Sequence, residues 1–379
     1  MKNILKKIFP LLFLRKVQLI FNQLLMKIYY PLAFPKFQVQ QADYLEMHTV
    51  NPFRQLFREK SFDEKEKNDF KLWLGEDWNQ DHYIIRIGIP HQIESLYGWA
   101  YASGRRLIYP SLGLSSAPYL KRPSLWDSVV KKPSINFDHI VSFRDTGEEN
   151  YFHFFNDVIA KFYWLESKAL LNSKQVFLVS EKLYRRDYFQ YFINKTRLGN
   201  YNWKIQAEKE LIGSSDTLFC KTATHDRFLY DQMLKDIDVP KENLKQKKRI
   251  YLTRKDTSLR FISNEQELLP VLKEYGFEVI DPSEMSFAEQ VNLFSQASCL
   301  VSTHGAGLTN MMFRKGGPMK VVELFSPYQG YNPFHYIMMA EMFGFGYDYI
   351  IGKPSALKYK GGFDVSRIEL LEIMKALDV

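Results

Sequence analysis

The second half of this 379-residue chain alternates short apolar runs with segments that have helical periodicity. Strands are predicted at 249–254, 277–282, 299–303, 320–325 and 347–352. Two of the intervening segments begin with the spacing of a capping box, Ser263 with Gln266 and Ser286 with Glu289. Strands that are apolar along their length and separated by helices predict a parallel, doubly wound sheet.

The first half has a different pattern. Aromatic and β-branched runs punctuated by Gly and Pro predict short strands at 82–89, 97–103, 105–111, 138–145 and 175–180. A proline followed by a charged run predicts a linker at 238–249. The chain is therefore expected to divide into an N-terminal segment (1–35), an α/β domain (36–238) and a C-terminal Rossmann-like domain (239–379), whose last helix could cross back.

Residues 1–35 combine apolar and basic side chains. The apolar run at 8–14 is too short to span a bilayer, which takes roughly 20 residues. Helical spacing follows at Val17, Ile20, Phe21, Leu24, Leu25 and Ile28. With lysines on the other side, this pattern predicts a basic amphipathic helix on an anionic membrane surface, and a helix packed on the protein's own core is the alternative. We expect a cytoplasmic protein, peripheral on the inner face of the plasma membrane.

Composition excludes several kinds of site. The formal net charge is +8, but no nucleic-acid-binding module is present, so nucleic acid is not an expected partner. Cys220 and Cys299 are the only cysteines, and no His/Cys pair has the spacing of zinc ligands. No DxD sequence occurs in the second half, so we expect no metal cofactor.

The sequence "STHGAGLTNMMF" (302–313) follows the third strand of the second half. In open α/β sheets, ligands bind at the carboxyl ends of strands, where glycines let a ligand approach the backbone and a helix start offers N–H groups. The segment therefore predicts a pyrophosphate cradle, the alternative being a tight turn whose glycines serve only the backbone conformation. The predicted cradle residues are His304, Gly305, Ala306, Gly307 and Asn310.

The loop after the first strand of the second half is "TRKDTSLRFISN" (253–264). It lacks the GxGxxG of dinucleotide-binding enzymes, which disfavours an oxidoreductase. It contains Arg254, Lys255 and Arg260 instead, and guanidinium groups bind phosphates in bidentate geometry. A solvated basic loop is the alternative interpretation.

Four segments together carry a family resemblance. "NYFHFFNDV", "YLTRKDTSLRFISNEQEL", "STHGAGLTNMMF" and "VVELF", within about residues 140 to 345, resemble glycosyltransferase family 61. That family includes bacterial capsular polysaccharide transferases, plant xylan transferases and animal O-linked N-acetylglucosaminyltransferases. The resemblance implies a GT-B-like α/β fold, with two Rossmann-like domains facing a cleft. It also implies metal-independent, inverting transfer from a nucleotide sugar, with a UDP-sugar as the expected donor. The expected acceptor is a glycan or a lipid-linked molecule in bacterial surface polysaccharide synthesis.

The resemblance implies a role for Glu323, and the proton transfer that an inverting reaction needs indicates candidate bases. By similarity to GT-B donor sites, Glu323 would accept hydrogen bonds from ribose hydroxyls, unless it is only a carboxylate at a strand end. His153 and Asp157 lie four residues apart, so they share a helix face, and Asp157 could orient His153 as the base. Asp145 and Glu148 are alternative bases. A non-catalytic carbohydrate-binding or scaffold protein with the same fold is the alternative function.

Overall fold

A computed structural model describes residues 17, 20, 21, 24, 34–57, 63–66, 79–113, 132–222, 225–254, 260–327, 334–358 and 361–376. These residues form two compact units. The C-terminal unit contains the described residues within 53–76 and 238–379, and the N-terminal unit contains those within 15–52 and 77–237. Both units contain sheets and helices, which confirms the α/β class.

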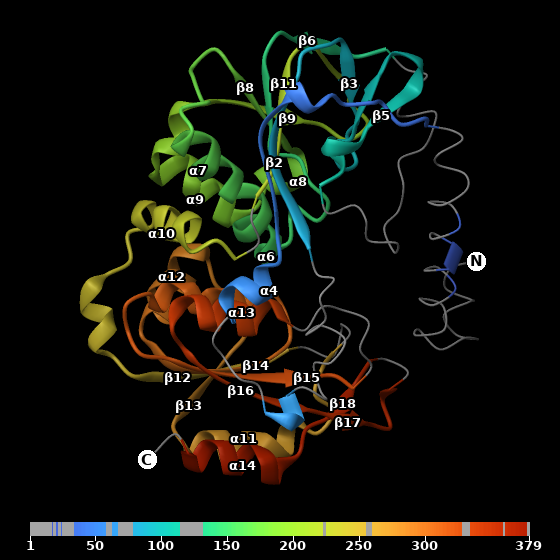
Figure 1. The fold of residues 1–379 in the computed structure, drawn as a ribbon. Coiled ribbons are helices and arrows are strands. Elements are labelled where there is room, and N and C mark those ends of the chain that lie inside the picture. The colour runs from blue at the N-terminus through green and yellow to red at the C-terminus, as the bar shows by residue number, and fades with distance from the viewer. Residues whose placement is uncertain are drawn as a thin grey trace. The chain divides into compact units, whose positions relative to one another are not determined.

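The C-terminal unit is built on one sheet of five parallel strands. Its order is β13 (Phe277–Ile280), β12 (Lys248–Leu252), β14 (Ala297–Thr303), β15 (Lys320–Phe325) and β16 (Gly346–Ile351). The connecting helices are α11 (Glu265–Glu274), α12 (Phe287–Ser295), α13 (Phe334–Phe343) and α14 (Arg367–Ala376). Figure 1 shows α11 and α14 on one face of this sheet and α12 and α13 on the other. The predicted parallel, doubly wound sheet is therefore present.

Apolar side chains join the helices to this sheet. Leu268 and Leu272 of α11 and Leu370 of α14 pack in one buried cluster with Val301 and Val322 of the central strands. The strands are apolar along their length because helices cover both faces of the sheet. Burial of this kind, at about 25 cal/mol per Å² of apolar surface, is the main stabilising term.

The two predicted capping boxes have different outcomes. At α12 the prediction is confirmed, because Ser286 Oγ accepts from Glu289 N and the Glu289 side chain accepts from Ser286 N. At α11 it is wrong, because the N-cap is Asn264. The Ser263 hydroxyl instead lies 2.7 Å from the Ser355 hydroxyl, so a tertiary hydrogen bond takes the group that the sequence assigned to the helix start.

The N-terminal unit contains two sheets. The first has the order β1 (Tyr44–Val50), β2 (Gln80–Ile87), β11 (Thr217–Lys221), β7 (Ile140–Ser142), β8 (Val176–Ser180) and β9 (Asn202–Gln206). The last four of these are parallel, whereas β1 and β2 are antiparallel to their neighbours. The second has the order β5 (Arg106–Ile108), β4 (Ala100–Ala102), β3 (His91–Ile93), β10 (Ile212–Ser214) and β6 (Ile135–Phe137).

The first sheet of this unit is covered differently on its two faces. Ile85, Leu178 and Phe219 on one face share a buried cluster with Ile93 and Ile108 of the second sheet. The other face is covered by α7 (Ala160–Ser167) and α9 (Asp187–Lys195). There, ring contacts link the strands to the helices, Phe177 to Phe162 and Trp203 to Phe189. The unit thus has a parallel, Rossmann-like part, but a second sheet replaces one layer of helices.

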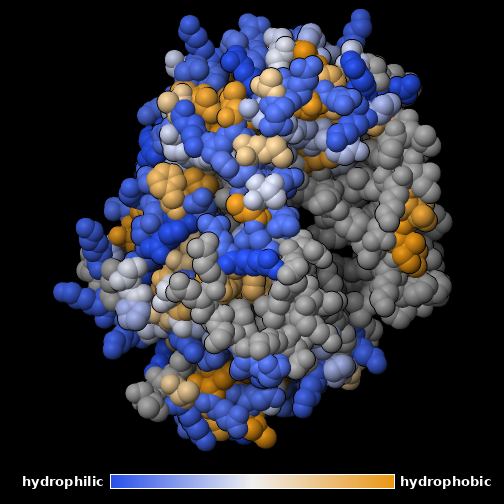
Figure 2. Space-filling view, in the orientation of Figure 1, coloured by the Kyte–Doolittle hydropathy of each residue, from blue (hydrophilic) through white to orange (hydrophobic). Residues whose placement is uncertain are grey.

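Shorter elements complete the described part of the chain. They are α4 (Pro52–Leu56), α6 (Tyr151–His153), α8 (Glu181–Tyr184), α10 (Arg227–Asp236), β17 (Lys353–Pro354) and β18 (Phe363–Asp364). Among the described residues on the face in view, Figure 2 shows a largely polar surface with apolar residues in small groups. Both cysteines are buried and free.

Most of the predicted N-terminal helix lies outside the described residues. Val17, Ile20, Phe21 and Leu24 are described; they are helical and 48–60% exposed. Within the described residues, no helix has the length and apolarity that crossing a membrane requires. The membrane-associating helix therefore stays a prediction.

Arg314, in the 3-10 helix η10 (Ala306–Arg314), is almost completely buried. Its guanidinium donates to the backbone oxygens of Asn243, Gln246, Ser295 and Pro318 at 2.8–3.3 Å. These contacts connect the predicted linker to α12 and to the turn before β15. A buried guanidinium that satisfies several carbonyls is therefore a structural group in this unit.

We predict that Arg314→Met lowers the free energy of unfolding by roughly 3 kcal/mol, because buried carbonyl oxygens lose their donors. Lys320→Met is the matched control: Lys320 is partly exposed and pairs with Asp348 at 2.7 Å, a surface pair worth about 1 kcal/mol or less. Urea denaturation of the full chain, followed by circular dichroism, measures both. Equal midpoints for the two variants would contradict this role of Arg314.

Candidate functional site

The strand order of the C-terminal unit brings two predicted segments together. The strand β12 is first in the chain but lies between β13 and β14, so the connections from it and from β14 diverge at their carboxyl ends. Such switch points are where open α/β sheets bind ligands. The strand β12 leads to Arg254 and β14 leads to His304. The two segments that were predicted to bind phosphate are thus neighbours at one sheet edge.

A close contact at Gly305 explains the first glycine of "HGAG". A Cβ atom at this position would lie 3.0 Å from Nη1 of Arg254, so the guanidinium lies against bare backbone. The backbone of Gly305 is extended (φ 169°), a conformation that any residue adopts. At Gly307 a Cβ would lie 3.1 Å from the Leu252 side chain. Both glycines therefore allow a neighbouring side chain to lie close to the backbone. Neither is needed for a positive φ, which was the alternative interpretation of this turn.

His304 is held by a buried carboxylate. Its Nδ1 lies 2.5 Å from Oε1 of Glu323, and Oε2 of Glu323 accepts from the Tyr347 hydroxyl at 2.6 Å. The ring also packs against Phe325 and Tyr336, with centroids 5.6 and 5.3 Å away. Glu323 is fully buried and both of its oxygens have partners within the unit. Its predicted contact with ribose stays untested, while the observed contacts orient His304.

Arg254 and Arg260 both lie near enough to Tyr336, which packs on the His304 ring, for their charges to act on it. Burial and the Glu323 charge raise the pKa of Tyr336, and the positive charges of Arg260 and Arg254 oppose that rise. Arg260 has a left-handed backbone (φ 69°), unusual for a side chain of this kind, and its N–H donates to Gly361 O at 3.0 Å. Lys255 lies outside the described residues.

The remaining cradle residues are placed differently. Ala306 begins η10 and is half-buried. Asn310 is completely buried, and its Nδ2 donates to Oε1 of Gln290 on α12 at 3.0 Å. The structure thus groups Arg254, Arg260, His304, Gly305 and Glu323, and directs the Asn310 amide toward α12.

A second cluster lies at the carboxyl end of β7 in the N-terminal unit. Asp145 Oδ2 accepts from Lys161 Nζ at 2.9 Å, and this ammonium also donates to Arg144 O at 3.1 Å. Asp145 and Lys161 are both buried. The strand β7 lies between β11 and β8, so this edge is the switch point of the parallel part of the unit.

Glu148, one alternative base, is engaged elsewhere. Arg144 Nε donates to its two oxygens at 2.9 and 3.2 Å, and the same guanidinium donates to Gln206 and to Ser95 O. Burial raises the pKa of Glu148, and the charge of Arg144 opposes that rise. Glu148 is therefore part of a buried ion pair with Arg144.

His153 and Asp157 are in direct contact. Nδ1 of His153 lies 2.7 Å from Oδ2 of Asp157, and Asn156 Nδ2 donates to Oδ1 of Asp157 at 2.9 Å. Burial lowers the pKa of His153, but the hydrogen bond and charge of Asp157, with Asp145 and Glu149, outweigh it and raise the value. The His153 side chain is 31% exposed, so the imidazole is partly accessible to solvent.

Some features of this cluster were not predicted. Residues Phe154–Ile159 form a π-helix between α6 and α7, and π-helical turns are frequent at functional sites. Lys161 was overlooked, although a lone lysine within the apolar run around it was a usable signal.

Asp236 and Asp238 form a DxD pair just before the second half, but Asp236 accepts from Tyr163 and Arg197, which makes it a structural group.

Within the described ranges, no group of three or more His, Cys, Asp or Glu side chains has the geometry of a metal site. The metal-independent mode stays a prediction. The chemistry that these clusters offer is electrostatic in the C-terminal unit, through two guanidiniums and an oriented imidazole. In the N-terminal unit it is proton transfer, through an accessible imidazole paired with a carboxylate.

Comparison with known families agrees with the motif analysis. Residues 151–322 match the model of the family described as glycosyltransferase 61. The matched range contains His153, Asp157, Arg254, Arg260 and the "HGAG" turn. The predicted resemblance is confirmed for this part of the chain.

Curated relatives match over a shorter range. Protein O-linked-mannose beta-1,4-N-acetylglucosaminyltransferase 2 from Xenopus tropicalis is 49% identical over 80 residues, which are 20% of this chain and 13% of the relative. The proteins of the same name from Canis lupus familiaris and Homo sapiens are each 46% identical over 83 residues, 14% of their length. The matches thus span only about an eighth of these relatives.

We predict that Asp157→Asn lowers the pKa of His153 by about one pH unit or more, because burial then meets less opposing charge. In the folded wild type the pKa of His153 is raised above the value of about 6.5 that it has in the unfolded chain. The pair of His153 and Asp157 therefore stabilises the fold fully below pH ~6.5, and this stabilisation is lost as the pH rises through the folded-state pKa. NMR titration of the labelled imidazole measures the pKa.

The matched control for this titration is Asp216→Asn. Asp216 lies 2.8 Å from Nδ1 of His139, so the change removes a carboxylate from a different histidine. It should leave the His153 titration unchanged. An unaltered His153 pKa in Asp157→Asn would show that Asp157 does not set the charge of this imidazole.

Proposed function

We propose that this chain, whose residues 151–322 match glycosyltransferase family 61, transfers a sugar from a nucleotide-sugar donor to a glycan or lipid-linked acceptor. The family and the curated relatives are glycosyltransferases. The observation that carries the proposal is the Arg254 guanidinium lying against the bare backbone of Gly305 at the switch point of a parallel sheet.

The donor site is proposed at this edge of the C-terminal unit. Arg254 and Arg260 would bind the diphosphate, since guanidinium groups match phosphate oxygens in bidentate geometry. His304 would donate from Nε2, because its Nδ1 faces Glu323. Two guanidiniums can neutralise the charge of a leaving nucleoside diphosphate, so the proposed mode is metal-independent. A UDP-sugar is the donor proposed first.

The base is proposed in the N-terminal unit. The acceptor hydroxyl oxygen attacks the anomeric carbon, the bond from that carbon to the phosphate oxygen breaks, and the nucleoside diphosphate leaves with the electron pair. Nε2 of His153 takes the hydroxyl proton, and Asp157 stabilises the resulting imidazolium through Nδ1. Displacement on the opposite face of the sugar inverts the anomeric centre. A GT-B-like arrangement of the two units is part of this proposal.

The cellular setting is also proposed. Four apolar side chains, at 17, 20, 21 and 24, are helical and exposed, and lysines surround them in the sequence. This supports a peripheral protein on the inner face of a bacterial plasma membrane, with acceptors that belong to surface polysaccharide synthesis.

We predict that Arg254→Ala weakens UDP binding by about 1.5 to 3 kcal/mol, because a charge-assisted contact to diphosphate is lost. Isothermal titration with UDP in the presence of EDTA measures it. Lys248→Ala removes a cation at the opposite end of β12 and should leave the affinity unchanged. Equal affinities in the two variants would overturn the donor site, and binding that needs added Mg²⁺ or Mn²⁺ would overturn the metal-free mode.

We predict that His153→Ala lowers kcat by roughly 10²–10⁴-fold, the usual contribution of a general base, and leaves UDP affinity unchanged. In the wild type, kcat should rise with pH through the raised pKa of His153, because only the neutral imidazole accepts a proton. Steady-state kinetics measure both effects. Near-normal turnover of His153→Ala, together with an inactive but folded Asp145→Asn, would assign the base to Asp145.

A further inference from the structure

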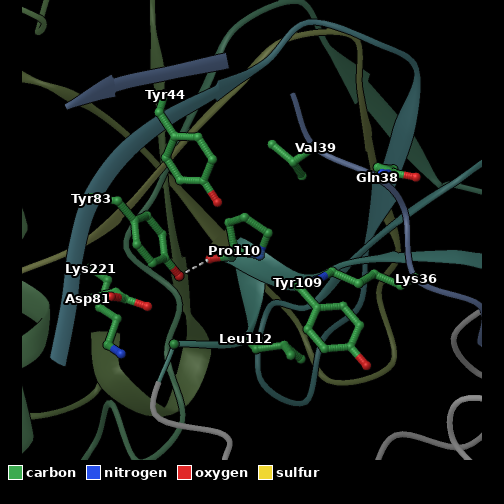
Figure 3. Close-up of a pocket in the computed structure, with 11 residues that line it drawn as sticks. Lys36, Gln38, Val39, Tyr44, Asp81, Tyr83, Tyr109, Pro110, Leu112 and Lys221 are labelled. Carbon is green, nitrogen blue, oxygen red and sulfur yellow. Dashed lines mark hydrogen bonds between the residues drawn. The ribbon is translucent and has the colours of Figure 1, made fainter. Parts of the chain in front are cut away.

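The N-terminal unit contains a pocket of about 720 Å³, a volume typical of small-ligand sites. It is formed by the segment before β1, by the starts of β1 and β2, by the segment after β5 and by the end of β11 (Figure 3). The residues that line it are Lys36, Gln38, Val39, Tyr44, Asp81, Tyr83, Tyr109, Pro110, Leu112, Gly113 and Lys221.

Three tyrosines give the pocket aromatic walls. Tyr44 and Tyr83 pack edge to face with centroids 5.9 Å apart, and the Tyr83 hydroxyl donates to Pro110 O at 2.8 Å, which fixes its ring (Figure 3). Tyr109 is 40% exposed, and among the described tyrosines it is the one classed as exposed. Lys36 Nζ lies 4.8 Å from its ring centroid. An exposed ring at the wall of a pocket is a surface on which a flat apolar face can stack.

Charged groups line the same pocket. Asp81 accepts from the Thr49 hydroxyl at 2.6 Å through Oδ1, which orients its carboxylate. Lys36 and Lys221 supply ammonium donors on other parts of the wall. A pyranose ring has an apolar C–H face and a rim of hydroxyls that both donate and accept. Aromatic faces beside mixed donors and acceptors match that chemistry, whereas a nucleoside diphosphate would require a more strongly cationic site.

The pocket shares a wall with the cluster that holds the proposed base. Gly113 has a left-handed backbone (φ 56°), and a Cβ there would lie 2.1 Å from Oδ1 of Asp145. The Asp145 carboxylate therefore lies directly against the pocket wall. Its charge also acts on His153. A ligand in the pocket is thus next to the ion pair of Asp145 and Lys161.

We propose that this pocket binds the saccharide portion of the acceptor, with a pyranose ring stacked on Tyr109 and its hydroxyls bonded to Asp81 and Lys221. This inference rests on the proposed function, which it extends by naming where the acceptor sugar is held. Its test is saccharide binding without a donor, so it can fail independently of nucleotide binding.

The experiment is saturation-transfer difference NMR on the full chain with maltose, cellobiose, lactose and chitobiose as probes. We expect at least one disaccharide to receive saturation at its ring C–H protons from the wild type. Tyr109→Ala should weaken this binding about tenfold or more, as truncation of an aromatic anchor does. Tyr109→Phe keeps the ring and should keep binding. Phe228→Ala removes another exposed ring (51% exposed) on α10 and should have no effect.

The opposite outcomes are equally defined. The pocket assignment is overturned if none of the four disaccharides binds, if binding to Tyr109→Ala equals that of the wild type, or if UDP displaces the disaccharide. Loss of UDP binding alone, with Tyr109-dependent saccharide binding intact, would overturn the donor proposal and leave a saccharide pocket. Intact UDP binding with Tyr109-independent saccharide binding would overturn only the pocket.

Discussion

The contact between the Arg254 guanidinium and the backbone of Gly305 is the constraint on which the C-terminal site depends. The two residues are 51 positions apart in the chain, and they meet because β12 and β14 are adjacent parallel strands. A Cβ at 305 would lie 3.0 Å from Nη1 of Arg254, so the guanidinium would have to shift by a few tenths of an ångström. The contact therefore depends on the sheet order, on the glycine and on the arginine together. The same turn places the imidazole of His304 next to Gly305.

The two histidine–carboxylate pairs differ in what surrounds them. Glu323 is fully buried, bonded by both His304 and Tyr347, and the His304 side chain is only 8% exposed. The His153 side chain is 31% exposed, and its partner Asp157 is oriented by a neighbouring asparagine. A group that must take a proton from an incoming hydroxyl needs access, whereas a group that binds a fixed phosphate needs rigidity. This difference in exposure supports the proposed division of roles.

Local sequence signals predicted the elements whose structure local forces decide. The parallel strands and the capping box at Ser286 follow from apolar runs and from hydrogen bonds within one turn. Long-range contacts decided the rest. Ser263 bonds to Ser355, 92 residues away, so its cap was wrong, and the second sheet of the N-terminal unit pairs strands as distant as β3 and β10. The contact of Asp145 with Gly113 could not be predicted, because nothing in either segment indicates the other.

The N-terminal cluster contains two buried ion pairs, Arg144–Glu148 and Asp145–Lys161, side by side at the end of β7. Buried pairs are poor sources of stability, since removing both charges from water offsets most of their attraction. Such pairs do hold the charged groups in fixed positions. The Lys161 ammonium holds the Asp145 carboxylate against Gly113. Burial lowers the pKa of His153, but the hydrogen bond and charge of Asp157 outweigh it, and the charge of Asp145 adds to that rise. The partly exposed imidazole of His153 thus lies beside carboxylates that favour its protonated form, which suits the general-base role proposed for it.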